Sequence, residues 1–139
     1  DSAVFGQKDY QQLLVIRRVQ ADLHLPVTVV AAPTARDPDG LALSSRNQYL
    51  DAAERARAPQ LHAALAECAA ALRAGKRNFG GLEARGLAAL EAAGFRPDYF
   101  AIRQAADLGP PEAASRNLVA LAAGHLGRTR LIDNLLVDL

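Results

Sequence analysis

A lysine and an aspartate stand side by side where an apolar helical pattern begins, in the segment FGQKDYQQ (residues 5–12). Lys8 supplies a mobile positive charge suited to phosphate, and Asp9 can accept hydrogen bonds from sugar hydroxyls. Gly6 lets a ligand approach the backbone closely, and the amides of a helix N-terminus favour an anion. The two glutamines can donate and accept hydrogen bonds, which suits a substrate with a carboxylate and a hydroxyl. The alternative is a polar first turn of a surface helix, with Asp9 placed for the helix dipole.

A second group of polar residues follows in LSSRN, residues 43–47. Ser44 and Ser45 offer rotatable donors, and Arg46 offers a planar fork of charge-assisted hydrogen bonds. Such donors would stabilise the charge on a departing pyrophosphate; the alternative is an ordinary serine-rich loop before a helix cap. Together with Lys8, one βα step earlier, this loop predicts a phosphate site held from two sides.

Other candidate residues carry less weight. Cys68 falls on an apolar helical stripe and is predicted to be a core residue in a reducing compartment. The histidines have no second ligand at metal-binding spacing, so we expect structural or surface roles and no metal site. Asp37 and Asp39 are typical of turns, and Asp133 is an isolated candidate for binding a cation. The three histidines are His24, His62 and His125.

Composition limits the classes of function. A chain of 139 residues is one domain, or one domain with a fragment of another. Half of the residues are hydrophobic, but 30 are alanine, so we expect a thin, helix-rich core. A net charge of +1 argues against nucleic-acid or membrane-surface partners recruited by bulk charge. Neither a signal peptide nor a membrane-length apolar run is present, and we expect a cytoplasmic protein.

Hydrophobic periodicity predicts a βαβ unit at the start of the chain. The opening DSAVFG resembles the end of a buried strand, residues 9–23 have helical spacing, and VTVVAA (27–32) is typical of a strand covered on both faces. Because such a unit cannot bury both faces alone, we expect a longer protein with neighbouring strands. Residues 33–47 form a loop that contains the domain boundary, so we assign residues 1–34 and 35–139 to separate domains.

The second part predicts helices followed by an antiparallel sheet, an α+β arrangement. Asp51 and Glu54 occupy the positions of a capping box, and Pro59 predicts a kink or break. An apolar stripe then continues to Gly75, and Gly94 ends the next helix. The remaining predicted elements are a helix over 79–93, strands over 98–103, 118–124 and 129–137, and a hairpin link over 124–128.

The motifs FGQKDYQQLLVIRR, DGLALSSRNQYLDAAERARAP and GRTRLIDN resemble those of the pantoate–β-alanine ligase family, over nearly the whole chain. The resemblance implies a Rossmann-like nucleotidylyltransferase domain followed by a small α+β domain of two helices and a three-stranded antiparallel sheet. It also implies ATP-dependent joining of pantoate and β-alanine through a pantoyl adenylate. ATP would be a substrate accompanied by Mg²⁺, and the enzyme a cytoplasmic homodimer.

The resemblance also implies roles for individual residues, in three groups. Lys8 and the Ser-Ser-Arg loop would be catalytic because they bind the phosphates of ATP, and Gln12 would bind pantoate. Residues near the helix start would contact the ribose and phosphates of ATP, and a backbone group would contact the adenine. The residues implied for ATP are Gly6, Gln7, Lys8, Asp9, Ala35, Leu43, Ser44, Ser45 and Arg46.

One family feature is absent from the chain. None of the three histidines stands in the family's His-x-Gly-His-type signature, and the second pantoate glutamine is missing as well. We therefore expect this chain to be the C-terminal portion of the enzyme, lacking its N-terminal half and inactive alone. Two alternatives stay open: a non-catalytic, self-associating C-terminal module, and a relative that adenylates another small hydroxy acid.

Overall fold

The computed structural model describes all 139 residues and divides into two compact units, Asp1–Ala35 and Arg36–Leu139. Each unit has its own sheet, of two strands in the first and three in the second. None of the helices combines the length and the apolar character needed to span a membrane. The sequence placed a domain boundary between residues 34 and 35; the assignment of the first part to a larger catalytic domain stays a prediction.

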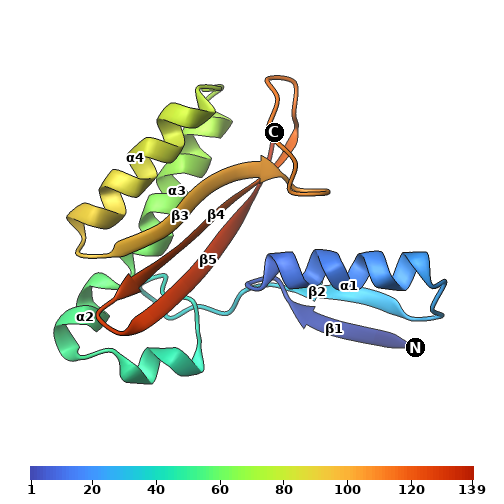
Figure 1. The fold of residues 1–139 in the computed structure, drawn as a ribbon, viewed down its shortest axis with the longest axis horizontal. Helices are drawn as coiled ribbons and strands as arrows, with labels where there is room; N and C mark the ends of the chain where they lie inside the picture. The colour runs from blue at the N-terminus through green and yellow to red at the C-terminus, as the bar shows by residue number, and fades with distance from the viewer. The chain divides into compact units, whose positions relative to one another are not determined.

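The first unit is a βαβ unit. Strand β1 (Ser2–Gly6) and strand β2 (Thr28–Ala32) pair in parallel along their whole length, and helix α1 (Tyr10–Asp22) connects them (Figure 1). A parallel pair cannot be closed by a tight hairpin, so the crossover helix is required. The carboxyl ends of both strands therefore lie at the same edge, with Gly6 opposite Ala32.

Helix α1 covers only one face of this two-stranded sheet. Tyr10 and Leu13 are its buried residues, whereas the paired residues Val4 and Val30 are 66% and 42% exposed. One face of the strand over residues 28–32 is therefore open within these 139 residues, as expected of a βαβ unit with a single helix; its coverage on both faces in a longer protein stays a prediction.

Local signals determine the helices of the second unit. The Asp51 carboxylate accepts a hydrogen bond from the Glu54 amide at 2.7 Å, and the Glu54 carboxylate accepts one from the Asp51 amide at 2.9 Å, which confirms the predicted capping box. The chain breaks at Pro59 as predicted, so the first helical pattern is split in two. The helices are the 3₁₀ helix η1 (Ser45–Tyr49), α2 (Ala52–Arg57), α3 (Gln60–Arg73) and α4 (Phe79–Ala92).

Three antiparallel strands complete the second unit: β3 (Arg96–Gln104), β4 (Asn117–Leu126) and β5 (Thr129–Asp138). Their order is β3-β4-β5. The predicted hairpin link over 124–128 is too long, since the ladder between β4 and β5 continues to the pair formed by Leu126 and Thr129. Only residues 127–128 lie outside the strands, because a two-residue turn matches the strand twist.

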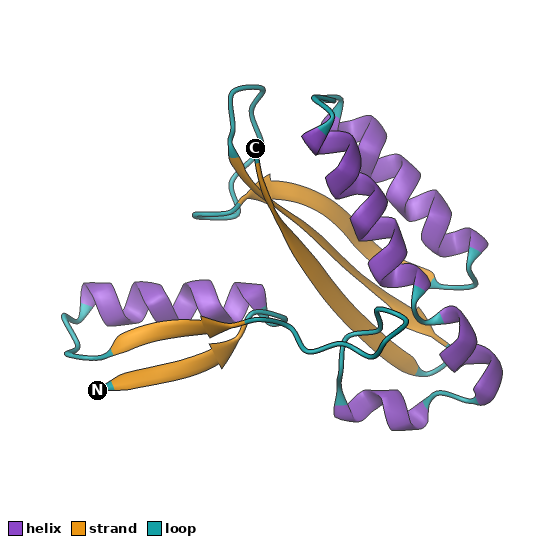
Figure 2. Ribbon diagram, turned by 180° about the vertical axis from the view of Figure 1, so that it is seen from behind, coloured by secondary structure: helices purple, strands orange, loops and turns teal.

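The second unit has two layers. Helices α3 and α4 lie side by side on one face of the sheet, with α3 against β4 and β5 and α4 against β3; Figure 2 shows this arrangement from behind. Residues 118–124 of the central strand are all buried. The α+β class is therefore confirmed, with three α-helices in this unit because of the break at Pro59.

The self-association alternative needs an exposed sheet edge. Residues 118–124 belong to the central strand β4, which is paired on both sides. Residues 129–137 belong to β5, which is an edge strand with no strand on its outer side. At Asn134 the backbone groups of β5 are already used, since the amide donates to Asp133 and the carbonyl accepts from Arg36.

Helix α4 approaches β3 closely at Gly86. A Cβ atom added there would lie 2.6 Å from the ring of Phe100, which is itself buried. A side chain at this position would therefore have to displace the ring or separate the helix from the sheet.

Gly86→Ala should lower the free energy of unfolding by about 1–3 kcal/mol through overpacking, although alanine is the better helix former. Gly80→Ala, in the same helix with nothing within 4 Å of its added Cβ, is the matched control and should be neutral or stabilising. Urea unfolding of both variants tests this expectation. Equal stabilisation by the two substitutions would contradict the close approach.

Candidate phosphate-binding loop

The polar loop predicted over residues 43–47 begins from a short turn, residues 36–42. Arg36 and Ala42 form an isolated antiparallel bridge, and the Asp37 amide donates to the Leu41 carbonyl at 2.9 Å. Gly40 closes the turn with a φ of +95°, a conformation that side-chain-bearing residues rarely adopt. The segment that leads into the loop is therefore an ordered turn.

Two arginines hold this turn from different sides through three ion pairs. Arg55 of α2 donates to Asp39 at 2.7 Å and to Asp37 at 3.0 Å. The hydrogen bond from Arg55 is the main reason that the pKa of Asp39 is lowered. On the other side, Arg36 bonds the carboxylate of Asp133 in β5 at 2.5 and 2.9 Å. The aspartates that the sequence assigned to turn chemistry do serve the turn.

The loop itself, residues 43–46, which we call the phosphate loop, exposes most of its side chains. Ser44 is the N-cap of η1, and its hydroxyl accepts a hydrogen bond from the Arg46 amide at 3.2 Å. Ser45 and Arg46 are exposed, and Leu43 is 50% exposed. Ser45 and Arg46 therefore reach solvent, whereas the half-buried Ser44 hydroxyl accepts a backbone hydrogen bond and keeps its own O–H able to donate.

Arg46 borders a surface hollow of about 820 Å³ between η1 and the tip of the β4–β5 hairpin. Arg130, also in its lining, is paired with Asp98 at 2.7 Å, and the hydrogen bond from Arg130 is the main cause of the lowered pKa of Asp98. The side chain of Arg46 is in no such ion pair, so its charge stays available to a ligand. The hollow is lined by Arg46, Tyr49, Asp51, Glu54, Gly127, Arg128, Thr129 and Arg130.

The predicted residues of the first unit gather at the carboxyl ends of its strands. Gly6 ends β1, and the amide of Gln7 donates to the carbonyl of Ala32 at the end of β2. Lys8 lies in the following turn, and Gln12 is exposed in the first turn of α1. Asp9 is the N-cap of that helix without a side-chain capping hydrogen bond. Its carboxylate is therefore not used as a cap, and its role in binding stays a prediction.

Ala35 is the last residue of the first unit, and the phosphate loop belongs to the second. The structure thus brings together Gly6, Gln7, Lys8, Asp9 and Gln12 at one strand edge, and Leu43, Ser44, Ser45 and Arg46 in one loop. A single phosphate site formed by both sets of residues stays a prediction.

The residues that support the loop were not identified from the sequence. The sequence pattern does not mark Arg36 and indicates Asp133 only as an isolated cation ligand, because the two partners are 97 positions apart. Asn47 was noted only as part of LSSRN, yet its side-chain amide donates to the Ala42 carbonyl at 3.0 Å. A charged residue within a strand pattern, as Asp133 is in TRLIDNLLV, was the available signal of a buried pair.

His62 lies beside the turn. Its Nδ1 atom is 3.9 Å from the Asp133 carboxylate, and a Cβ on Gly40 would meet the ring at 2.7 Å. Burial, and then the positive charge of Arg36, lower the pKa of His62 against the opposing effect of Asp133. His62 therefore packs against the turn. The structure contains no group of three His, Cys, Asp or Glu side chains that could hold a metal ion.

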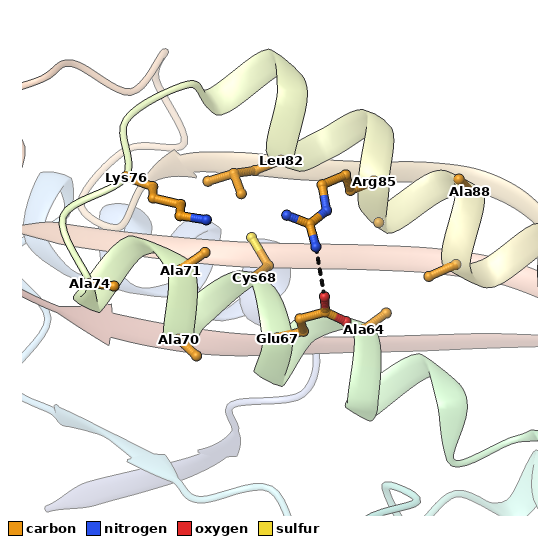
Figure 3. A pocket seen from close by; sticks show the side chains of 12 residues that line it. Ala64, Glu67, Cys68, Ala70, Ala71, Ala74, Lys76, Leu82, Arg85 and Ala88 are labelled. Carbon is orange, nitrogen blue, oxygen red and sulfur yellow. Dashed lines mark hydrogen bonds and ion pairs between the residues drawn. The ribbon is translucent and has the colours of Figure 1, made fainter.

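A second hollow, of about 570 Å³, lies between α3 and α4 and is lined largely by alanines. Figure 3 shows Cys68 there between Lys76 and Arg85, with Arg85 paired to Glu67 at 3.0 Å. Burial, with smaller effects from Glu83 and Glu67, raises the pKa of the Cys68 thiol to about 11. The thiol is therefore protonated at neutral pH, as expected of a core residue and not of a nucleophile.

Comparison with known families gives one match over most of the chain. The family model described as pantoate-beta-alanine ligase matches residues 1–136. The pantothenate synthetase of Nitrosococcus oceani is 58% identical over 137 residues, which are 99% of this chain and 48% of that protein. That of Stutzerimonas stutzeri is 58% identical over 139 residues, or 100% and 49%. The chain thus spans about half the length of the curated relatives that it matches.

Solved structures agree with this match. A pantothenate synthetase from Thermus thermophilus superposes with a TM-score of 0.90 at 44% identity, covering 96% of this chain and 49% of that one. A pantoate-beta-alanine ligase from Francisella tularensis, complexed with beta-gamma ATP and beta-alanine, gives a TM-score of 0.62 at 25% identity. It covers 97% of this chain and 43% of that one.

The lowered pKa of His62 predicts a loss of stability on acidification. The unfolded chain takes up a proton on His62 near its ordinary pKa of about 6.5, whereas the folded chain stays neutral to lower pH. The unfolded state therefore binds more protons below that pH, and the free energy of unfolding falls. Urea unfolding at about pH 7.5 and about pH 5.5 should show a larger loss for the wild type than for His62→Asn, which lacks this titration. Equal losses would contradict the assignment.

The raised pKa of Cys68 predicts slow alkylation with a steep pH dependence. The thiolate is the reacting species, so the rate with iodoacetamide should rise about tenfold per pH unit up to about pH 10. Peptide mass spectrometry measures this rate, with glutathione as the control thiol. A plateau for Cys68 near the pKa of an ordinary cysteine, about 8.5, would contradict the burial of the thiol.

Proposed function

The chain belongs to the pantoate-beta-alanine ligase family, and we propose that it is the C-terminal part of an enzyme that makes pantothenate from pantoate and β-alanine. The observation that carries the proposal is a Ser-Ser-Arg loop with exposed Ser45 and Arg46, following a turn that is held from two sides, in a chain that this family model matches over residues 1–136. Within this proposal the 139 residues alone do not turn over. Ligase activity of the isolated chain would contradict that part of it.

The proposed reaction has two steps. A carboxylate oxygen of pantoate attacks the α-phosphorus of ATP, the bond to the β-phosphate breaks, and pyrophosphate leaves. The amine of β-alanine then attacks the acyl carbon of the adenylate, loses a proton to solvent, and displaces AMP. Beta-gamma ATP and beta-alanine are bound by the Francisella tularensis relative, and we extend these substrate classes to this chain.

In this proposal the phosphate loop acts in the first step. Ser45 and Arg46 are exposed donors, and negative charge builds on the β- and γ-phosphates as the bond to the α-phosphorus breaks. Donors held in place before the reaction stabilise such charge without further reorganisation. The Arg46 guanidinium would bind two phosphate oxygens at once, with Ser44 and Leu43 shaping the loop around them.

The strand edge of the first unit binds the other parts of the substrates in this proposal. Lys8 balances phosphate charge, Gly6 and Asp9 receive the ribose, and Gln12 binds pantoate, while Gln7 and the backbone of Ala35 complete the nucleotide site. Mg²⁺ would accompany ATP and balance part of the phosphate charge, as it does in other sites where it binds through substrate phosphates. A homodimeric state and a cytoplasmic location stay predictions.

Arg46→Ala and Lys8→Ala in the complete enzyme should each lower the rate of adenylation by about 10²–10³-fold, as expected on removing a group that stabilises developing charge. Release of pyrophosphate in a single turnover measures this step. Arg85→Ala is the matched control, because Arg85 forms only an exposed pair with Glu67, and its rate should be unchanged. If the Arg46 and Lys8 variants released pyrophosphate at the wild-type rate, the roles assigned to these two residues would be wrong.

A further inference from the structure

The guanidinium of Arg36 joins the start of the second unit to its sheet. It makes two hydrogen bonds to the Asp133 carboxylate, at 2.5 and 2.9 Å. It also donates to the carbonyl of Gly40 at 3.1 Å and to that of Asn134 at 3.4 Å. One side chain thus ties the turn of residues 36–42 to strand β5.

This ion pair is buried, unlike the pair on the other side of the turn. The side chains of Arg36 and Asp133 are 19% and 2% exposed, whereas those of Arg55, Asp37 and Asp39 are 35–45% exposed. Exposed pairs are weakened by solvent and salt, but a buried carboxylate that loses its partner is strongly disfavoured. The Arg36–Asp133 pair is therefore the stronger constraint on the position of the turn.

The constraint reaches the phosphate loop through two connections. Ala42, buried and bridged to Arg36, directly precedes the loop. Asn47, directly after it, donates its side-chain amide to the Ala42 carbonyl at 3.0 Å. Both ends of residues 43–46 are thus attached to the turn that Arg36 holds.

Arg36 itself is poorly suited to bind phosphate. Its guanidinium is mostly buried, and its charge is balanced by Asp133, so an anion would have to compete with a fixed carboxylate. The exposed guanidinium of Arg46 has no such partner. Arg36 can therefore act on a phosphate through the placement of the loop, and not by contact.

We propose that Arg36 and Asp133 are positioning residues for the pyrophosphate-forming step, holding the phosphate loop where Ser45 and Arg46 meet the departing phosphates. This inference rests on the proposed function. It predicts an asymmetry between the two half-reactions, because pyrophosphate has already left when β-alanine attacks. Misplacing the loop should slow adenylation and spare the second step.

The test uses the complete enzyme with two variants of the pair. Asp133→Asn and Arg36→Lys should lower single-turnover pyrophosphate release by about 10–100-fold, the scale expected of a small misplacement. The reaction of supplied pantoyl adenylate with β-alanine should stay within about twofold of wild type, since it does not use these donors. If Asp133→Asn fails to fold, Arg36→Lys, which keeps the positive charge, provides the result.

Glu83→Gln is the control for a merely structural effect. Glu83 accepts hydrogen bonds from Arg103 at 3.1 Å and from the Ile102 amide at 2.9 Å, away from the loop. Its loss should lower stability without changing the ratio of the two half-reactions. Equal slowing of both half-reactions by Arg36→Lys, or no slowing of either, would overturn the inference.

A double-mutant cycle separates this inference from the proposed function. If Arg36 acts through the loop, Arg36→Lys should have little further effect on adenylation in an Arg46→Ala background. Full additivity would overturn the positioning role while leaving the role of Arg46 intact. Failure of Arg46→Ala alone to slow adenylation would instead remove the proposed function of the loop.

Discussion

A buried carboxylate must be neutralised, and this requirement determines how the second unit holds its polar loop. Asp133 is 2% exposed in its side chain, and its nearest cation is Arg36, 97 positions earlier in the chain. Pairing them fixes the first residue of the unit against the edge strand β5. The turn of residues 36–42, the Asn47 hydrogen bond and the exposed loop all follow from that attachment.

In this unit the turn is held in place by ion pairs, and the loop that follows it exposes its polar side chains. The turn is held by a buried ion pair on one side and by the exposed ion pairs of Arg55 on the other. Ser45 and Arg46, in the loop that follows the turn, are exposed to solvent. Loops that carry binding groups commonly depend on a rigid scaffold. Here the scaffold is a small α+β unit whose alanine-rich helices pack close to the sheet, as the contact of Gly86 with Phe100 illustrates.

Much of the local structure was predictable because its causes are local. The reciprocal hydrogen bonds of Asp51 and Glu54, and the break at Pro59, depend on residues within a few positions of one another. The open face of strand β2, where Val30 is 42% exposed, fits the expectation that a βαβ unit cannot bury both faces alone. The prediction was wrong where a pattern had more than one reading. The link over 124–128 proved shorter, since glycine and histidine also fit within a strand.

The sequence alone determined the order of the strands and α-helices, their approximate bounds, the family and the two motifs with phosphate chemistry, because each depends on residue types at short spacing. The 3₁₀ helix over Ser45–Tyr49 was not predicted, since its first residues were assigned to a loop. Only the tertiary structure decided that Arg36 and Asp133 form one buried pair, that the Arg46 guanidinium is in no ion pair, and that His62 lies against the turn. Most of these contacts join residues distant in sequence. A periodic pattern in the sequence cannot predict such contacts, because they depend on how the turn of residues 36–42 packs against strand β5 and helix α3.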